Sequence, residues 1–521
     1  MEKLYLCFDI MSGISEIEEK QHTESSVKAE DEATYDHIVK YTGFLGGIQV
    51  LTLLVGVIRN KLAAVLLNTV GVGLSSLYQN VLNFMQNTSG LGISFSSIKE
   101  ISEFYGRGDA EAIARHVCVV RTWGVWTGLA GMLLCVLLSP LISFCAFDDF
   151  SHSSAICLLS PVVVFMSVTS AELAVLKAVR RLKRVALISV FSALAALFST
   201  IPFYYCWGMR GIVPALLLSS FGVMAVHLYF SVRVYPWKVG LWDKGNLRAG
   251  WGMVCLGVPY ILANVVNAAM GMGLGLFIAS SGSLSDVGLY NMGYNLIFMY
   301  AGIIFTAVDT DYFPRLAAVG NDTEWMNVVI NRQIKVGVLL MSPFLVLFVL
   351  AMPIVVRILY SDAFLPMVGM AICASMHLFF KSMTLPVAYI SLARGDALMF
   401  LCMEVAYDVF MAACVMVGYV YYGVLGTGIA LALAGVFDWC MIFLVYGRRY
   451  GFRLQRGFKP FIICQFFCVA LALALGLQPV WWLKVVAGGL VLVCSAGLSI
   501  WVLRREMTIF SEFKQRFWHK T

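Results

Sequence analysis

Long stretches of apolar residues, separated by short polar connections, make up almost the whole chain. A helix needs about 20 mainly apolar residues to cross the hydrocarbon core of a bilayer. About fourteen stretches reach that length, so the pattern predicts an all-α polytopic membrane protein. The predicted spans are residues 41–58, 71–98, 117–140, 155–178, 184–206, 211–231, 251–280, 286–311, 333–358, 364–392, 397–419, 424–446, 458–477 and 480–503.

Basic residues follow a second pattern, because they gather on alternate connections between the spans. Cytoplasmic connections of membrane proteins carry an excess of Lys and Arg. With the N-terminus placed inside, most of the 37 Lys and Arg residues fall on the cytoplasmic side. We therefore expect a multi-pass protein of the bacterial inner (plasma) membrane with both termini in the cytoplasm. The net charge of +7 then reflects topology, and nucleic acid is not an expected partner.

A short internal repeat indicates how the spans are grouped. Val72-Gly73-Leu74 recurs as Val287-Gly288-Leu289, and the same offset places Asn80 on Asn295. Because transporters are often built from repeated halves, we interpret the match as two pseudo-symmetric six-helix lobes followed by two C-terminal helices. Six is an even number, so the lobes have the same orientation. They are then related by an axis along the membrane normal and enclose a central cavity.

The predicted organisation begins with an acidic cytoplasmic tail over residues 1–40, which we expect to be disordered. The remaining units are an N-terminal lobe over 41–231, a cytoplasmic linker over 232–250, a C-terminal lobe over 251–446, two extra helices over 458–503 and a basic cytoplasmic tail over 504–521.

Composition supports a membrane protein and disfavours enzymes. Charged residues make up 13% of the chain, whereas soluble domains carry roughly 25%. The 14 cysteines form no CxxC or Cys/His cluster, so we expect no metal site. The sequence contains no Walker A, HExxH or nucleophile-elbow motif, and its outer connections are too short to fold as a catalytic domain. We therefore expect a transporter without catalytic residues or a cofactor.

The N-terminal region, from Gly46 to Glu103, resembles a known family. The matching features are, in order, Arg59-Asn60-Lys61, Gly71-Val72-Gly73-Leu74, Leu91-Gly92-Ile93-Ser94 and Lys99-Glu100-Ile101-Ser102. This stretch resembles Wzx-type polysaccharide (O-antigen) flippases of the multidrug/oligosaccharidyl-lipid/polysaccharide (MOP) superfamily, which are related to MATE transporters. The sharp match covers mainly the first hundred residues, whereas hydropathy and length cover the whole chain.

The resemblance implies a MATE-like fold that works by alternating access. Its implied cargo is an undecaprenyl-pyrophosphate-linked oligosaccharide, which moves from the inner to the outer leaflet during biosynthesis of lipopolysaccharide or another surface polysaccharide. The expected partners are this lipid-linked oligosaccharide, membrane lipids and other membrane proteins of polysaccharide assembly. The resemblance does not fix which sugar is carried.

Polar side chains inside the spans are costly in lipid and are therefore candidates for function. Gln79, Asn83 and Gln86 share one helical face of the second span. Amides both donate and accept hydrogen bonds, which suits sugar hydroxyls or a wet cavity. The alternative is hydrogen bonding between helices. The full set of candidate cavity-lining residues is Gln79, Asn80, Asn83, Gln86, Asn87 and Asn295.

Acidic residues inside the spans are candidates for coupling to a proton or a sodium ion. Glu404 and Asp408 are one helical turn apart, so two ionised carboxylates would repel each other there. Glu172 and Asp438 are single acids in the fourth and twelfth spans. The alternative for each is an ion pair with a basic residue, for example Lys381.

Four basic residues are candidates for a cationic clamp on the pyrophosphate, because the positive-inside rule does not explain their positions. Arg59 and Lys61 lie at the outer end of the first span, Arg357 lies at another outer end, and Lys381 lies within a span. Arginine suits phosphate because its fork contacts two oxygens at once. The alternative is that these side chains reach toward lipid headgroups.

Two other functions stay open from the sequence. A multidrug or cation antiporter of the same superfamily would also carry acids in its spans, although the Wzx-like stretch disfavours it. A membrane glycan polymerase is the third alternative, which the short outer connections disfavour.

Overall fold

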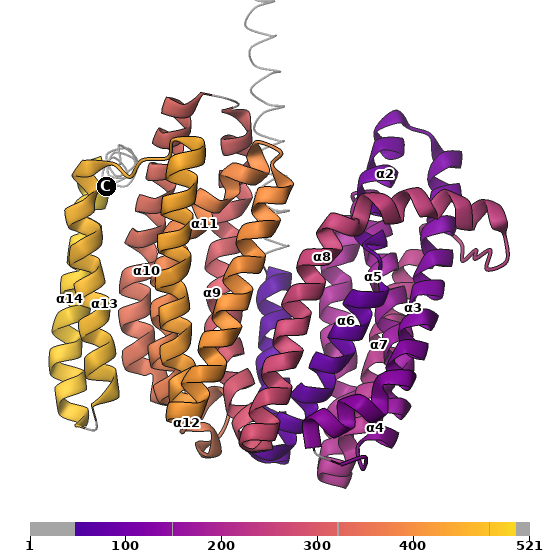
Figure 1. Ribbon diagram of the computed structural model, residues 1–521, viewed down its shortest axis with the longest axis horizontal. Coiled ribbons are helices and arrows are strands. Elements are labelled where there is room, and N and C mark those ends of the chain that lie inside the picture. Colours follow the sequence, from indigo (N-terminus) through magenta and orange to yellow (C-terminus); the bar gives the residue numbers. More distant parts are fainter. Residues whose placement is uncertain (1–46, 148, 320–321, 479, 507–521) are drawn as a thin grey trace, which may run out of the picture.

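The computed structural model describes residues 47–147, 149–319, 322–478 and 480–506, and within these ranges the fold is helical without a strand (Figure 1). The predicted tail over 1–40 and most of the tail over 504–521 lie outside these residues. The first half contains a helix over Gly47–Ser89, α2 (Ile93–Arg107), α3 (Ala110–Phe147), α4 (Ser153–Leu159), α5 (Pro161–Ala178), α6 (Leu182–Trp207) and α7 (Ile212–Val232). The second half contains α8 (Lys244–Ser281), α9 (Leu284–Ala318), α10 (Thr323–Leu359), α11 (Met367–Ala393), α12 (Ala397–Tyr450), α13 (Lys459–Leu477) and α14 (Trp481–Glu506).

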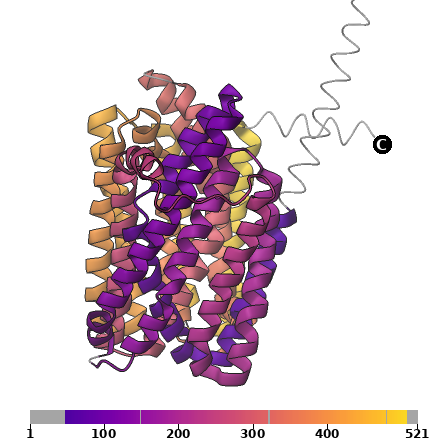
Figure 2. The ribbon, with the colours of Figure 1, turned by 90° about the vertical axis from the view of Figure 1, so that its right-hand side faces the viewer.

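The helices form two lobes, which confirms the predicted fold class. In Figure 1, α2 to α7 lie on one side and α9 to α12 on the other, while α13 and α14 pack against α10 at the far edge. Figure 2 shows that the long helices run in nearly one common direction, as expected for membrane spans. The C-terminal pair is therefore an addition to the second lobe.

Ten helical segments of the described residues are long and apolar enough to cross a membrane. Three of the ten contain a backbone break, at Asn68, at Gly208 and at Tyr422–Gly423. At the last break the chain turns back, because Gly418 and Gly426 come into close contact across it. One segment with such a break can thus hold two crossings, and the number of fourteen spans stays a prediction.

The second predicted span, 71–98, was wrong at its inner end. The helix stops at Ser89, and α2 starts at Ile93 after two residues with left-handed backbone, Leu91 and Gly92 (φ 46° and 64°). Glycine adopts positive φ at little cost, so Gly92 allows this break. The chain therefore bends at this end of the first lobe, where a pocket forms.

The α8 helix connects the two lobes. It begins at Lys244, inside the predicted linker 232–250, because the Asp243 side chain caps it by accepting from the Gly245 N–H. Near its start, the Asn246 carbonyl accepts a hydrogen bond from Trp123 of α3 (3.3 Å). Further along, Asn267 donates to Asp408 of α12 (3.3 Å). One helix therefore contacts the first lobe at one end and the second lobe at the other.

The repeated glycines lie in direct contact where the lobes meet. A Cβ on Gly73 would collide with the Leu284 carbonyl oxygen, and a Cβ on Gly288 would collide with the Thr69 carbonyl oxygen. The repeat offset that takes Gly73 to Gly288 also takes Thr69 to Leu284, so the two contacts are reciprocal. Reciprocal contacts are the mark of a two-fold axis. The pseudo-symmetry predicted from the repeat is therefore visible in the packing.

A hydrogen bond from Ser285 Oγ to Thr69 Oγ1 (2.7 Å) reinforces this contact. We call Thr69, Gly73, Leu284, Ser285 and Gly288 the outer seam, because they lie at or within a few residues of connections that the Lys/Arg distribution assigns to the outside.

Candidate functional site

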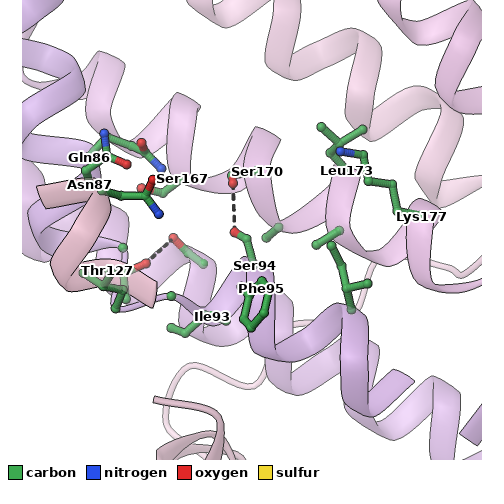
Figure 3. Close-up of a pocket in the computed structure, with 18 residues that line it drawn as sticks. Gln86, Asn87, Ile93, Ser94, Phe95, Thr127, Ser167, Ser170, Leu173 and Lys177 are labelled. Atoms are coloured by element: carbon green, nitrogen blue, oxygen red, sulfur yellow. Dashed lines mark hydrogen bonds between the residues drawn. The ribbon is translucent and has the colours of Figure 1, made fainter. Parts of the chain in front are cut away.

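A pocket of about 310 Å³ lies where the helix Gly47–Ser89 ends and α2 begins (Figure 3). Its walls come from the break at residues 90–92 and from α2, α3 and α5, and α8 adds Ile261 and Asn264. The pocket therefore lies between the first lobe and the connecting helix. Counted along the helix, Gln86 at the pocket is about 20 Å from Gly73 of the outer seam.

The pocket lining is rich in hydroxyl and amide groups. Ser94 Oγ and Ser170 Oγ are 2.8 Å apart across the pocket, and the amides of Gln86 and Asn87 line the same space. Ser167 is 5% exposed, and its hydroxyl has no hydrogen-bond partner among the described residues. A buried hydroxyl without a partner costs free energy, so this position is suited to a polar ligand.

The structure places the predicted cavity-lining amides in different surroundings. Gln86 and Asn87 line the pocket, whereas Asn80 donates to the Gly271 carbonyl of α8 at 3.5 Å, as the alternative of interhelical hydrogen bonding expects. The other three predicted residues, Gln79, Asn83 and Asn295, are exposed.

The predicted clamp cations do not gather at one place. Lys61 Nζ donates to the Arg357 carbonyl (2.6 Å), and Arg357 Nε lies 3.0 Å from Asp362 Oδ1, so these three residues form one cluster across the lobes. Arg59 instead interacts electrostatically with Tyr204 of α6. Lys381 lies in the second lobe, with Nζ 5.6 Å from the centre of the Tyr407 ring.

The predicted acids Glu404 and Asp408 lie in a polar cluster inside the second lobe. Asp408 is 4% exposed and interacts electrostatically with both Glu404 and Lys381. Asp408 also accepts a hydrogen bond from Asn267 of α8. Asp438, in the other half of α12, accepts a hydrogen bond from Thr384 (2.8 Å) and is 3% exposed. Asp408 is therefore buried beside a second acid and a lysine.

Glu172 lies in a buried ion pair instead. Arg121 Nε is 2.7 Å from Glu172 Oε1 and Nη2 is 3.0 Å from Oε2, and the two side chains are 1% and 0% exposed. Arg121 also donates to the carbonyls of Tyr235 (3.1 Å) and Pro236 (2.7 Å), and its guanidinium lies 5.0 Å from the Trp237 ring centre. The pair therefore fixes the inter-lobe linker to α3 and α5.

Sequence reasoning missed Arg121 and the serines of the pocket. Arg121 falls near the start of the predicted span 117–140 and was not identified as a candidate, whereas the structure buries it within α3. The usable signal was a charged residue close to an apolar stretch. Ser167 and Ser170 gave none, because serines inside helices commonly bond to their own backbone.

The described part of the chain contains no group of three or more His, Cys, Asp or Glu residues that could hold a metal ion.

Comparison with known proteins agrees with this architecture. The sequence matches the family of polysaccharide biosynthesis proteins over residues 64–369. No curated protein sequence matches the chain. Among solved structures, the lipid II flippase MurJ in an inward closed conformation is similar with a TM-score of 0.68 and 13% identity, covering 89% of this chain and 99% of that one.

Two transporter structures share this fold. An inward-facing multidrug resistance MATE family transporter of the MOP superfamily is similar with a TM-score of 0.62 and 13% identity, over 77% of this chain and 98% of that one. An outward-facing structure of a transporter with the same description is similar with a TM-score of 0.54 and 14% identity. It covers 78% of this chain and 94% of that one. The fold of the chain is therefore MATE-like.

Proposed function

We propose that this chain, which belongs to the family of polysaccharide biosynthesis proteins, is a flippase that moves an undecaprenyl-pyrophosphate-linked oligosaccharide from the inner to the outer leaflet. The family and the MurJ- and MATE-like fold support a lipid-linked flippase or transporter of the MOP superfamily. We propose further that the cargo is an oligosaccharide of a surface polysaccharide such as O-antigen. We also propose that the protein lies in the bacterial inner membrane with both termini in the cytoplasm. Alternating access without catalysis is its mechanism.

The observation that carries the proposal is the difference between the two ends of the molecule. At the outer seam the lobes touch through backbone, with no room for a side chain at Gly73 or Gly288. About 20 Å away along the same helix, the chain encloses a polar pocket. A carrier that takes its cargo from the inner leaflet needs this arrangement.

The pocket is suited to sugar hydroxyls. Ser167, Ser170 and Gln86 offer both donors and acceptors within one half-open pocket. Because α8 supplies Asn264 to the same pocket, a sugar bound there touches the helix that connects the lobes. Binding can therefore influence the position of the lobes, which a carrier requires.

The Ser167→Leu substitution should reduce glycan export about tenfold or more. The leucine removes a polar contact and fills the pocket, and one lost hydrogen bond to a ligand is worth about 1 kcal/mol or more. Surface glycan is measured in a strain that lacks the native gene and expresses the variant at a matched level. Ser189→Leu in α6 is the matched control, because its hydroxyl donates to the Val185 carbonyl of its own helix. Equal export by both variants would exclude a sugar site in the pocket.

We propose that the cluster around Asp408 couples transport to an ion, either a proton or sodium. Asn267 from α8, Lys381 from α11, Tyr294 from α9 and both Glu404 and Tyr407 from its own helix are among the groups that face Asp408. A carboxylate held among these groups can exchange a proton or a bound cation as the lobes move. The same cluster favours the second candidate function, a multidrug or cation antiporter. A glycan polymerase gains no support from it.

The Asp408→Asn substitution should lower the transport rate at least tenfold and remove its dependence on the ion gradient, because the amide neither titrates nor carries charge. Purified protein in liposomes is measured with an imposed pH gradient and, separately, with a sodium gradient. Asp362→Asn at the exposed outer cluster is the control. If transport by Asp408→Asn still depends on the ion gradient, the ion-coupling site lies elsewhere in the protein. Export of small cations, with no flipping of lipid-linked sugar, would favour the antiporter.

A further inference from the structure

A second pocket, of about 480 Å³, lies where the C-terminal pair of helices packs on the second lobe. This volume is within the roughly 300–1,000 Å³ of ordinary ligand pockets. The pocket is separate from the proposed sugar site, since its lining comes from α10, α13, α14 and the connection that leads into α13. The lining residues are Lys335, Gln455, Gly457, Phe458, Pro460, Phe461, Cys464, Leu498, Trp501 and Val502.

The pocket is polar at one end and apolar along its walls. Lys335 of α10 and Gln455 of the connection form the polar end, with Lys335 Nζ 5.3 Å from the centre of the Phe458 ring. Phe461 of α13 and Trp501 of α14 belong to the apolar walls. Trp501 is 59% exposed near the end of α14, as expected of a tryptophan at a membrane interface. This division fits an amphiphile that lies along the helices.

The charge around the polar end is positive. Arg453 and Arg456 are exposed on the connection between α12 and α13, Lys459 is exposed at the first position of α13, and residues 451–460 contain no acid. The same connection is one of the basic segments that the Lys/Arg distribution assigns to the cytoplasm. Basic pockets between membrane helices on the cytoplasmic side bind anionic lipid headgroups.

We propose that this pocket binds one anionic phospholipid of the inner leaflet. Its phosphate lies at Lys335 and the basic connection, and an acyl chain lies against Phe461 and Trp501. The lipid would occupy the space between the second lobe and the C-terminal pair. The pair itself is held together by buried polar contacts, since Ser495 Oγ donates to Gln465 Oε1 (2.6 Å). Because the lipid contacts both the pair and the lobe, it would strengthen the attachment of the pair to the lobe. The site is separate from the proposed sugar site, so lipid binding does not require the cargo.

Native mass spectrometry of the purified full chain in detergent tests the site. The probes are dioleoyl phosphatidylglycerol, the zwitterionic dioleoyl phosphatidylethanolamine and undecaprenyl phosphate, each titrated alone. We expect phosphatidylglycerol to bind at least fivefold more tightly than phosphatidylethanolamine. Lys335→Glu should weaken phosphatidylglycerol binding at least fivefold, because each basic group near an anionic lipid contributes about that factor. Arg332→Glu is the matched control, exposed on the same helix and outside the pocket lining.

Cys464→Trp is the second variant, which fills the apolar wall from an exposed position without changing charge. It should weaken phosphatidylglycerol binding as Lys335→Glu does, so the test stands if either variant fails to fold. Equal binding of both phospholipids overturns the proposal. An equal loss in Arg332→Glu also overturns it, because the effect would then be general surface charge. Undecaprenyl phosphate that binds more tightly than phosphatidylglycerol, and is lost in Lys335→Glu, would make the pocket a cargo site instead.

Discussion

Gly73→Leu is expected to reduce transport more than a hundredfold while the protein still inserts into the membrane. At Gly73 even a Cβ meets the Leu284 carbonyl oxygen and approaches the Gly288 nitrogen, which are backbone atoms of α9. Backbone cannot rotate away as a side chain does, so the lobes must separate at the outer seam. Overpacking in a well-packed core costs about 3 kcal/mol at the upper end of its usual range, and a clash with backbone lies at that end. That free energy opposes closure of the outer end, and it corresponds to more than a hundredfold in the population of the closed state.

Pseudo-symmetry extends this prediction to a second glycine. Gly288→Leu should have the same effect as Gly73→Leu, because the reciprocal contact places the Thr69 carbonyl oxygen against it. Gly56→Leu is the matched control, since a Cβ there meets nothing within 4 Å. Glycan export and the amount of protein in the membrane are measured for all three variants. Normal export by Gly73→Leu would mean that the outer seam does not close during transport.

Glu172→Ala is expected to unfold or strongly destabilise the first lobe. The substitution leaves Arg121 buried without its carboxylate, and breaking a buried ion pair costs about 3–5 kcal/mol. The thermal unfolding temperature of the purified protein measures this loss. Arg115→Ala removes a partner from the exposed pair with Glu111, which should cost about 0–1 kcal/mol. The two arginine pairs thus differ in burial and in the number of hydrogen bonds that each arginine makes.

The double variant Arg121→Met/Glu172→Leu separates a structural role from ion coupling. Replacing both charges with apolar side chains removes the unpaired charge, so most of the stability should return. If Glu172 were a coupling site, Glu172→Gln would keep normal stability and lose transport. That outcome would contradict the structural role given to the Arg121–Glu172 pair.

Much of the fold could be predicted from the sequence because hydropathy reports directly on membrane spans. Breaks inside helices were harder, since left-handed backbone at Leu91 and Asn68 leaves no trace in the apolar pattern. The repeat at Gly73 and Gly288 predicted the symmetry, but not that the repeated glycines touch each other. A sequence repeat shows that two residues occupy equivalent positions in the two lobes. Whether the two residues touch depends on how near they lie to the pseudo-symmetry axis.

The candidate site was harder to predict than the fold. Lys61 and Arg357 were both identified as unexplained cations, yet only the structure brings residues so far apart in the chain together. Lys381 and Arg59 were identified on the same grounds and lie elsewhere. Charge in a span indicates that a residue has a partner or a role, but it does not name the partner. Ser167 has neither charge nor periodicity, so the pocket became visible only through burial.

The central claim is that lipid-linked oligosaccharide crosses the bilayer by opening and closing of the outer seam. Thr69 Oγ1 and Ser285 Oγ are 2.7 Å apart, so cysteines at both positions should form a disulfide across the lobes. The variant is reconstituted in liposomes with a fluorescent undecaprenyl-pyrophosphate-linked oligosaccharide, and the flipping rate is measured before oxidation, after oxidation and after reduction. Oxidised protein without the two substitutions controls for its own 14 cysteines. The account predicts that flipping falls to the rate of empty liposomes on oxidation and recovers on reduction. Flipping at the full rate with the disulfide formed would contradict it.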